Sequence, residues 1–89
     1  MIFIIIGELM VKVLFFATLK DKSGTRQAEF DLPAGTTIAQ LKVVTVERFP
    51  AMQEALDHCL ASINHHYSAD DSEIPAEAEV AFFPPVSGG

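Results

Sequence analysis

Short stretches rich in β-branched and aromatic residues alternate along the chain with polar stretches that contain glycine, proline or aspartate. Residues 11–17 and 26–32 predict two strands, because apolar side chains recur at alternate positions. On the second strand, one face would carry Ala28, Phe30 and Leu32. The polar connection at 20–25 includes Gly24, which suits a hairpin between the two strands.

A helix is predicted after Pro33-Ala34-Gly35, which stops the second strand. Thr36 or Thr37 can cap its start. It should end near Phe49, because Pro50 disfavours a helical conformation in the residue before it. A second, weaker helical piece is predicted at 52–57. The residues of the main helix that fall at helical spacing are Ile38, Leu41 and the pair Val44-Thr45.

The remaining pattern predicts a short strand at 60–64, a polar turn at 65–73 and a last strand at 79–83. Alternation along the last strand would turn Val80 and Phe82 to the core. The order strand, strand, helix, strand, strand predicts an α+β fold, with one main helix on one mixed sheet.

Composition limits the class of protein. The chain has 89 residues, enough for one domain, and 49% are apolar, enough for a core. Its single cysteine, Cys59, excludes an internal disulfide and predicts a reduced, cytoplasmic protein. A net charge of −6 argues against nucleic acid as a partner. The apolar run at 1–6 is too short to span a membrane.

The first residues are expected to lie outside the domain. Gly7 and Glu8 interrupt the apolar run, and a second methionine follows at Met10, which we interpret as the natural start. The predicted organisation is therefore an upstream extension at 1–9, a domain at 10–83 and a tail at 84–89.

Charge is distributed unevenly. All six Lys and Arg residues lie between Lys12 and Arg48, and seven carboxylates follow Arg48. The tail thus leaves an acidic half, which would suit a basic partner surface. A solvated acidic face that only aids solubility is an equally weighted alternative.

Candidate metal and catalytic residues are few. His58-Cys59 and His65-His66 point in different directions, and no C-x-x-C or H-x-x-x-H spacing accompanies them, so we assign them structural or surface roles. Cys59 has no evident paired base. Asp70 and Asp71 lie in the predicted turn, where aspartate commonly bonds the local backbone.

The tail carries the strongest chemical signal. It reads Pro84-Pro85-Val86-Ser87-Gly88-Gly89. The prolines hold the chain extended, and the two glycines can thread a channel too narrow for side chains. A carboxylate on Gly89 is a poor electrophile until it is converted to an acyl-adenylate. The sequence has no glycine-rich phosphate loop, so a partner would supply ATP and activation. We therefore expect a carrier rather than an enzyme, with no cofactor bound by this chain.

The chain resembles the small subunit of molybdopterin synthase, a ubiquitin-like sulfur carrier with a β-grasp fold. The resemblance covers residues 10–89 and is most specific at the end. The segments that carry it are 11–17 (VKVLFFA), 32–41 (LPAGTTIAQL), 47–50 (ERFP), 62–64 (SIN) and 79–89 (EVAFFPPVSGG).

The resemblance implies a cycle. A ubiquitin-activating-type enzyme would adenylate Gly89, a sulfur donor protein would install sulfur, and the thiocarboxylate would enter the large synthase subunit. There it would pass sulfur to precursor Z, cyclic pyranopterin monophosphate. Gly88 would keep the tail slim, with Val86 and Ser87 in the channel, and Phe83, Pro84 and Pro85 would rest on the partner. The family resemblance also suggests two small and two large subunits.

Some features depart from the family pattern, and some functions stay open. Glu77-Ala78 stands where the family usually has Gly-Asp, so that turn should differ in shape. The run 43–46 is β-branched, which lowers intrinsic helicity. The alternatives are a sulfur carrier for thiazole or another product, a protein modifier whose Gly89 ends as an amide on lysine, and a plain binding module. Phe83 in a second core layer is an alternative to Phe83 as an anchor.

Overall fold

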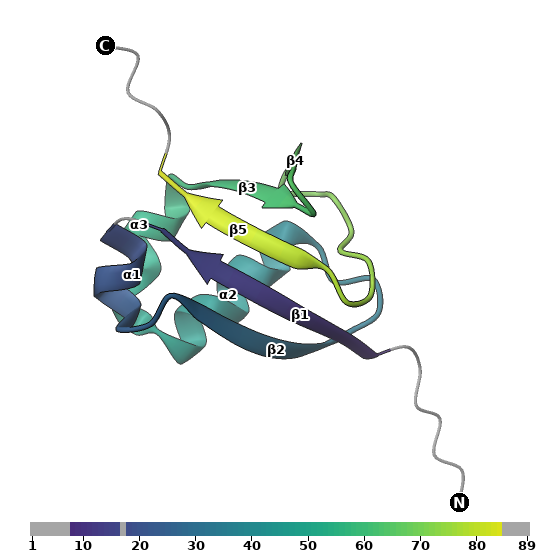
Figure 1. Cartoon of the computed structure of the whole chain (residues 1–89), viewed down its shortest axis with the longest axis horizontal. Helices are drawn as coiled ribbons and strands as arrows, with labels where there is room; N and C mark the ends of the chain where they lie inside the picture. The colour runs from purple at the N-terminus through teal and green to yellow at the C-terminus, as the bar shows by residue number, and fades with distance from the viewer. Residues whose placement is uncertain (1–7, 17, 85–89) are drawn as a thin grey trace, which may run out of the picture.

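The computed structural model describes residues 8–16 and 18–84, which form one mixed sheet with helices over one face (Figure 1). The strand order is β2-β1-β5-β3-β4; β1 and β5 are parallel, and the other neighbours are antiparallel. The strands are β1 (Glu8–Phe15), β2 (Gln27–Pro33), β3 (Leu60–Ile63), β4 (His66–Ser68) and β5 (Glu79–Phe83). The predicted α+β layout is confirmed.

The main helix, α2 (Ile38–Arg48), begins and ends as predicted. Thr37 is its N-cap: the Gln40 N–H donates to Thr37 Oγ1 at 3.3 Å, and the Thr37 N–H donates to Gln40 Oε1 at 2.9 Å. This reciprocal pair satisfies two backbone donors at the helix start. The second helical piece is also confirmed, as a 3-10 turn at Pro50–Met52 followed by α3 (Gln53–Asp57).

The core lies between the sheet and the helices. The β5 alternation is as predicted, with Val80 and Phe82 both fully buried. Thr45, in the β-branched part of α2, is buried too, and its hydroxyl donates to Leu41 O at 2.8 Å. Tertiary packing thus holds a helix whose intrinsic propensity is low. Other fully buried side chains are Val11, Val13, Phe15, Leu19, Phe30, Ile38, Leu41, Met52 and Leu56.

The first strand begins earlier than the sequence indicates. We expected strand from Val11, but β1 starts at Glu8, opposite Pro33 of β2. Leu9 pairs with Leu32 and is buried. Two residues of the expected extension therefore belong to the sheet, because both pair with residues of β2. Residues 1–7 lie outside the described part of the chain.

The connection between β1 and β2 is not the simple hairpin turn that we predicted. It contains a short helix, α1 (Thr18–Ser23), which places Leu19 in the core. Gly24 ends this helix with φ +78°, and its N–H donates to Lys20 O at 2.9 Å. Glycine occupies this left-handed position without steric cost. The burial of one leucine explains why a polar segment folds as a helix.

The polar segment 65–73 contains a strand that the sequence analysis missed. β4 pairs with β3 through a two-residue turn, in which Asn64 and His65 have φ 51° and 73°. Positive φ at both central residues is the geometry of a type I′ turn. Asn-Gly is the usual signal for that turn, and Asn-His does not carry it. The rest of the segment was correctly predicted as irregular.

Candidate functional site

An apolar patch lies on the sheet face that the helices leave uncovered. We define the apolar patch as Phe16, Leu60, Tyr67 and Phe83. The first three side chains are 48%, 42% and 77% exposed, and Phe83 is half-buried. Contiguous exposed apolar side chains on a small domain commonly mark a surface that binds another protein.

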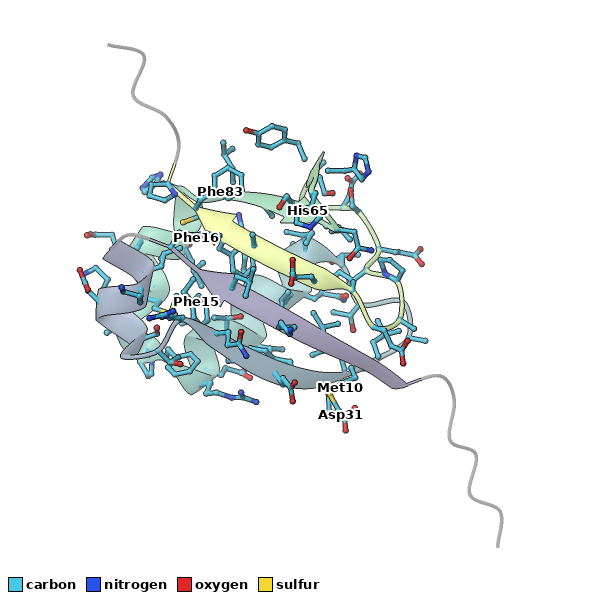
Figure 2. All side chains as sticks on the ribbon, in the orientation of Figure 1. Met10, Phe15, Phe16, Asp31, His65 and Phe83 are labelled. Atoms are coloured by element: carbon cyan, nitrogen blue, oxygen red, sulfur yellow. The ribbon has the colours of Figure 1, made fainter. Side chains whose placement is uncertain are left out.

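Strand register brings these residues together from distant parts of the sequence. Phe83 pairs with Leu60, and Phe15, which precedes Phe16, pairs with Phe82, which precedes Phe83. Paired residues project from the same face, and the two faces alternate along each strand. The Tyr67 and Phe83 rings are 5.7 Å apart between centroids, with a tilt of 58°. Figure 2 shows Phe16 and Phe83 at the same end of the sheet.

Phe83 lies on the outer face of the sheet, where its side chain is partly covered. Its side chain is half-buried by sheet neighbours, and it lies on the face opposite Phe82 and the core. It is therefore part of an outer surface rather than of a second core layer. Pro84 follows and is exposed.

The other end of this sheet face is charged. Lys12 lies between Glu29 and Glu79 in the strand register, and Asp31 pairs with Met10 (Figure 2). The charged side chains thus gather around Met10 at one end of this face, and the apolar patch lies at the other end. The apolar end is where β5 finishes, and the charged end is where β5 begins.

Most of the predicted tail lies outside the described part of the chain. Those outside the described part of the chain are Pro85, Val86, Ser87, Gly88 and Gly89. Of the predicted site residues, Phe83 and Pro84 are described, and they stand at the apolar patch. The sequence analysis gave Leu60, Tyr67 and Phe16 no role in the site. At Tyr67 it also predicted no strand. Alternation beyond Phe15 was the signal that could have found Phe16.

Cys59 has the contacts of a structural thiol. It is buried, and its Sγ–H donates to Ala55 O at 3.1 Å. Burial raises the pKa of the Cys59 thiol, and the nearby Lys42 ammonium only partly opposes this. The Lys42 ammonium donates to Cys59 O at 3.1 Å and pairs with Asp70 Oδ1 at 3.2 Å. A thiol kept protonated in this way is a weak nucleophile.

Neither metal binding nor membrane insertion has support in the described residues. Across 8–16 and 18–84, no three His, Cys, Asp or Glu side chains gather closely enough to hold a metal ion. Over the same residues, every helix is too short or too polar to cross a bilayer.

This chain is similar to known proteins over most of its length. The profile of the ThiS family matches residues 13–89. The chain is 35% identical over 82 residues to the molybdopterin synthase sulfur carrier subunit of Escherichia coli, covering 90% of this chain and 100% of that one.

Two solved structures have the same fold at 27% identity. One is a putative molybdopterin converting factor, subunit 1, from Pyrococcus furiosus, with a TM-score of 0.79 over 88% of this chain and 99% of that one. The other is SAMP1 from Haloferax volcanii, with a TM-score of 0.80 over 90% and 99%. The fold is the predicted ubiquitin-like β-grasp.

Proposed function

The chain belongs to the ThiS family, and from its similarity to the molybdopterin synthase sulfur carrier subunit of Escherichia coli we propose that it is the sulfur carrier subunit of a molybdopterin synthase. The observation that carries the proposal is the extent of the similarity. It runs from the first strand through Gly89, and the whole length of the Escherichia coli sulfur carrier subunit is matched. A shared fold would be weaker support, because one fold hosts many functions.

Gly89 is the group that carries sulfur in this proposal. An adenylating enzyme joins the Gly89 carboxylate to the AMP part of ATP, and pyrophosphate leaves. A donor protein delivers sulfur at the oxidation level of sulfide, which attacks the acyl carbon and displaces AMP, so that a thiocarboxylate forms. In the large subunit the thiocarboxylate passes its sulfur to precursor Z, and hydrolysis of the acyl group by water returns the carboxylate. This chain supplies the reacting carboxylate and binds no cofactor, while ATP is bound by the activating enzyme.

The apolar patch supplies the docking surface. Phe83 and Leu60 are adjacent on paired strands, and β5 ends at Phe83, so a partner seated on the patch lies beside the start of the tail. Exposed aromatic side chains are the usual centres of binding energy in protein interfaces. The large synthase subunit is the partner we assign to this surface, in a complex of two small and two large subunits. Pro84 and Pro85 would continue the contact toward the partner's active site.

A protein modifier is the alternative from another functional class. SAMP1 from Haloferax volcanii is small archaeal modifier protein 1, and its sequence is 27% identical to this chain. A modifier would use the same adenylate but would end as an amide on a lysine. The relatives named as sulfur carrier subunits are more similar in sequence, at up to 35% identity, and favour the carrier.

The test is the intact mass of the full chain isolated from cells with a working sulfuration system. A shift equal to one oxygen-to-sulfur exchange, mapped to Gly89, is expected. Deleting Gly89, or adding one residue after it, should abolish sulfur transfer and leave the melting temperature unchanged. Unchanged transfer by either variant would refute Gly89 as the carrier residue. Lysine-linked conjugates without any thiocarboxylate would favour the modifier.

A further inference from the structure

The outer edge of β2 is only partly closed by hydrogen bonds. β2 is the last strand on its side of the sheet (Figure 1). The Phe15 N–H donates to Arg26 O at 2.8 Å, and such hydrogen-bonded pairs alternate along antiparallel strands. The peptide groups that point away from β1 therefore belong to Gln27, Glu29, Asp31 and Pro33.

Local side chains close both ends of this edge. Thr25 Oγ1 accepts the Gln27 N–H at 3.4 Å and donates to Gln27 O at 2.9 Å. At the other end, Pro33 has no N–H, and its carbonyl accepts from the Thr36 N–H and hydroxyl at 3.3 and 2.7 Å. Neither end can add another strand without breaking these bonds.

Arg48 closes the middle of the edge from a distant part of the sequence. It lies in the last turn of α2, and its Nη1 donates to Glu29 O at 2.9 Å. Its guanidinium carbon lies 4.0 Å from the centroid of the Phe30 ring, which is a cation–π contact. Without Arg48, the outward groups of Glu29 and Asp31 would form one uninterrupted run. Among the described residues, no side chain bonds to the outward groups of Asp31.

We propose that the β2 edge is a strand-pairing surface for a second copy of this chain, and that Arg48 keeps this surface closed. An exposed edge strand is a template for pairing with another chain. Two copies of β2 can pair antiparallel about a two-fold axis, since each presents the same peptide groups. β2 has seven residues, a normal strand length, whereas the opposite edge strand, β4, has only three.

The charges on β2 add a second barrier to this pairing. An axis midway between Glu29 and Asp31 would set each Glu29 beside the partner copy's Asp31. Like charges directly opposite each other destabilise a pair of strands. Salt screens charges that are exposed to solvent, so dimers formed without Arg48 should be more stable at high ionic strength.

The test compares the full chain with Arg48→Met by sedimentation velocity over a wide concentration range. Methionine keeps a long side chain over Phe30 but cannot donate to Glu29 O. Arg26→Met is the matched control, since it removes the same charge from an exposed position just before β2. Adding Asp31→Pro to Arg48→Met should restore the monomer, because proline blocks pairing at the outward N–H.

Arg48→Met is expected to form a dimer whose fraction rises with protein concentration and with salt. The parent chain and Arg26→Met are expected to remain monomeric under the same conditions. The proposal is overturned if Arg48→Met associates no more than Arg26→Met does. It is equally overturned if the dimer persists with Asp31→Pro, since contact would then run through exposed apolar side chains. Melting temperatures of all variants confirm that folded chains are compared. None of these results depends on the proposed sulfur chemistry.

Discussion

Asn64 and Glu79 exchange two hydrogen bonds across the start of β5. The Asn64 N–H donates to Glu79 O at 2.8 Å, and the Glu79 N–H donates to Asn64 Oδ1 at 2.9 Å. The side chain of a turn residue thus takes the place of a strand partner. This exchange fixes the register of β5, in which Phe82 enters the core and Phe83 joins the apolar patch.

Replacing Asn64 should separate its two contributions. Asn64→Gly keeps the left-handed φ and loses the bond to the Glu79 N–H, so we expect a loss of about 1 kcal/mol in the free energy of unfolding. Asn64→Ala loses the bond and also forces alanine to φ 51°, adding roughly 1–2 kcal/mol. Urea denaturation of both variants measures the difference. Equal losses would show that the left-handed conformation contributes little.

His65→Gly should stabilise the chain. His65 has φ 73° in the type I′ turn, a conformation that glycine adopts freely. Relief of this strain, less the greater freedom of glycine in the unfolded chain, predicts a gain of roughly 0.5–1 kcal/mol. Glycine would lose the exposed contact between His65 Nε2 and Glu79 Oε1, at 3.6 Å, but the loss of this contact should reduce the free energy of unfolding only slightly. Thermal unfolding near neutral pH provides the measurement. A lower melting temperature would assign the contact more weight than its exposure suggests.

Phe82→Ala should mainly lower stability, whereas Phe83→Ala should mainly weaken binding. Phe82 is fully buried, so its truncation should cost about 3–5 kcal/mol. Phe83 is half-buried on the outer face, and its truncation should cost about 1 kcal/mol while weakening the complex with the large subunit about tenfold or more. Calorimetric titration and thermal unfolding report the two quantities. A melting temperature as low as that of Phe82→Ala would place Phe83 in the core.

The stability of the chain should depend on Cys59 at alkaline pH. Burial raises the pKa of this thiol above its ordinary value of 9.0, so the unfolded chain releases the proton first. Stability from the neutral thiol is complete below that value and is lost as the pH rises through the folded pKa. Cys59→Ser, which does not titrate there, should lose less stability over the same interval. Parallel slopes of unfolding free energy against pH would contradict this prediction.

Some turns have positive φ at residues whose types do not predict it. Glu77 has φ 59°, in the region that favours glycine. The sequence indicated only that this turn should differ in shape, because Glu77 replaces a residue that is usually glycine in the family. The hairpin at Asn64-His65 was likewise not predicted, because neither residue type requires positive φ. Tertiary contacts around each turn hold these residues in place at a local cost.

Elements with local signals could be predicted from the amino-acid sequence: the capped helix after Thr37, the alternating strand around Phe82 and the family pattern that ends at Gly89. These follow from periodicity and capping, which need only neighbouring residues. The gathering of Phe16, Leu60 and Tyr67 beside Phe83, and the bond from Arg48 to the β2 edge, follow from the folded structure alone. Strand register and helix packing join residues far apart in the chain, and no local pattern contains that information.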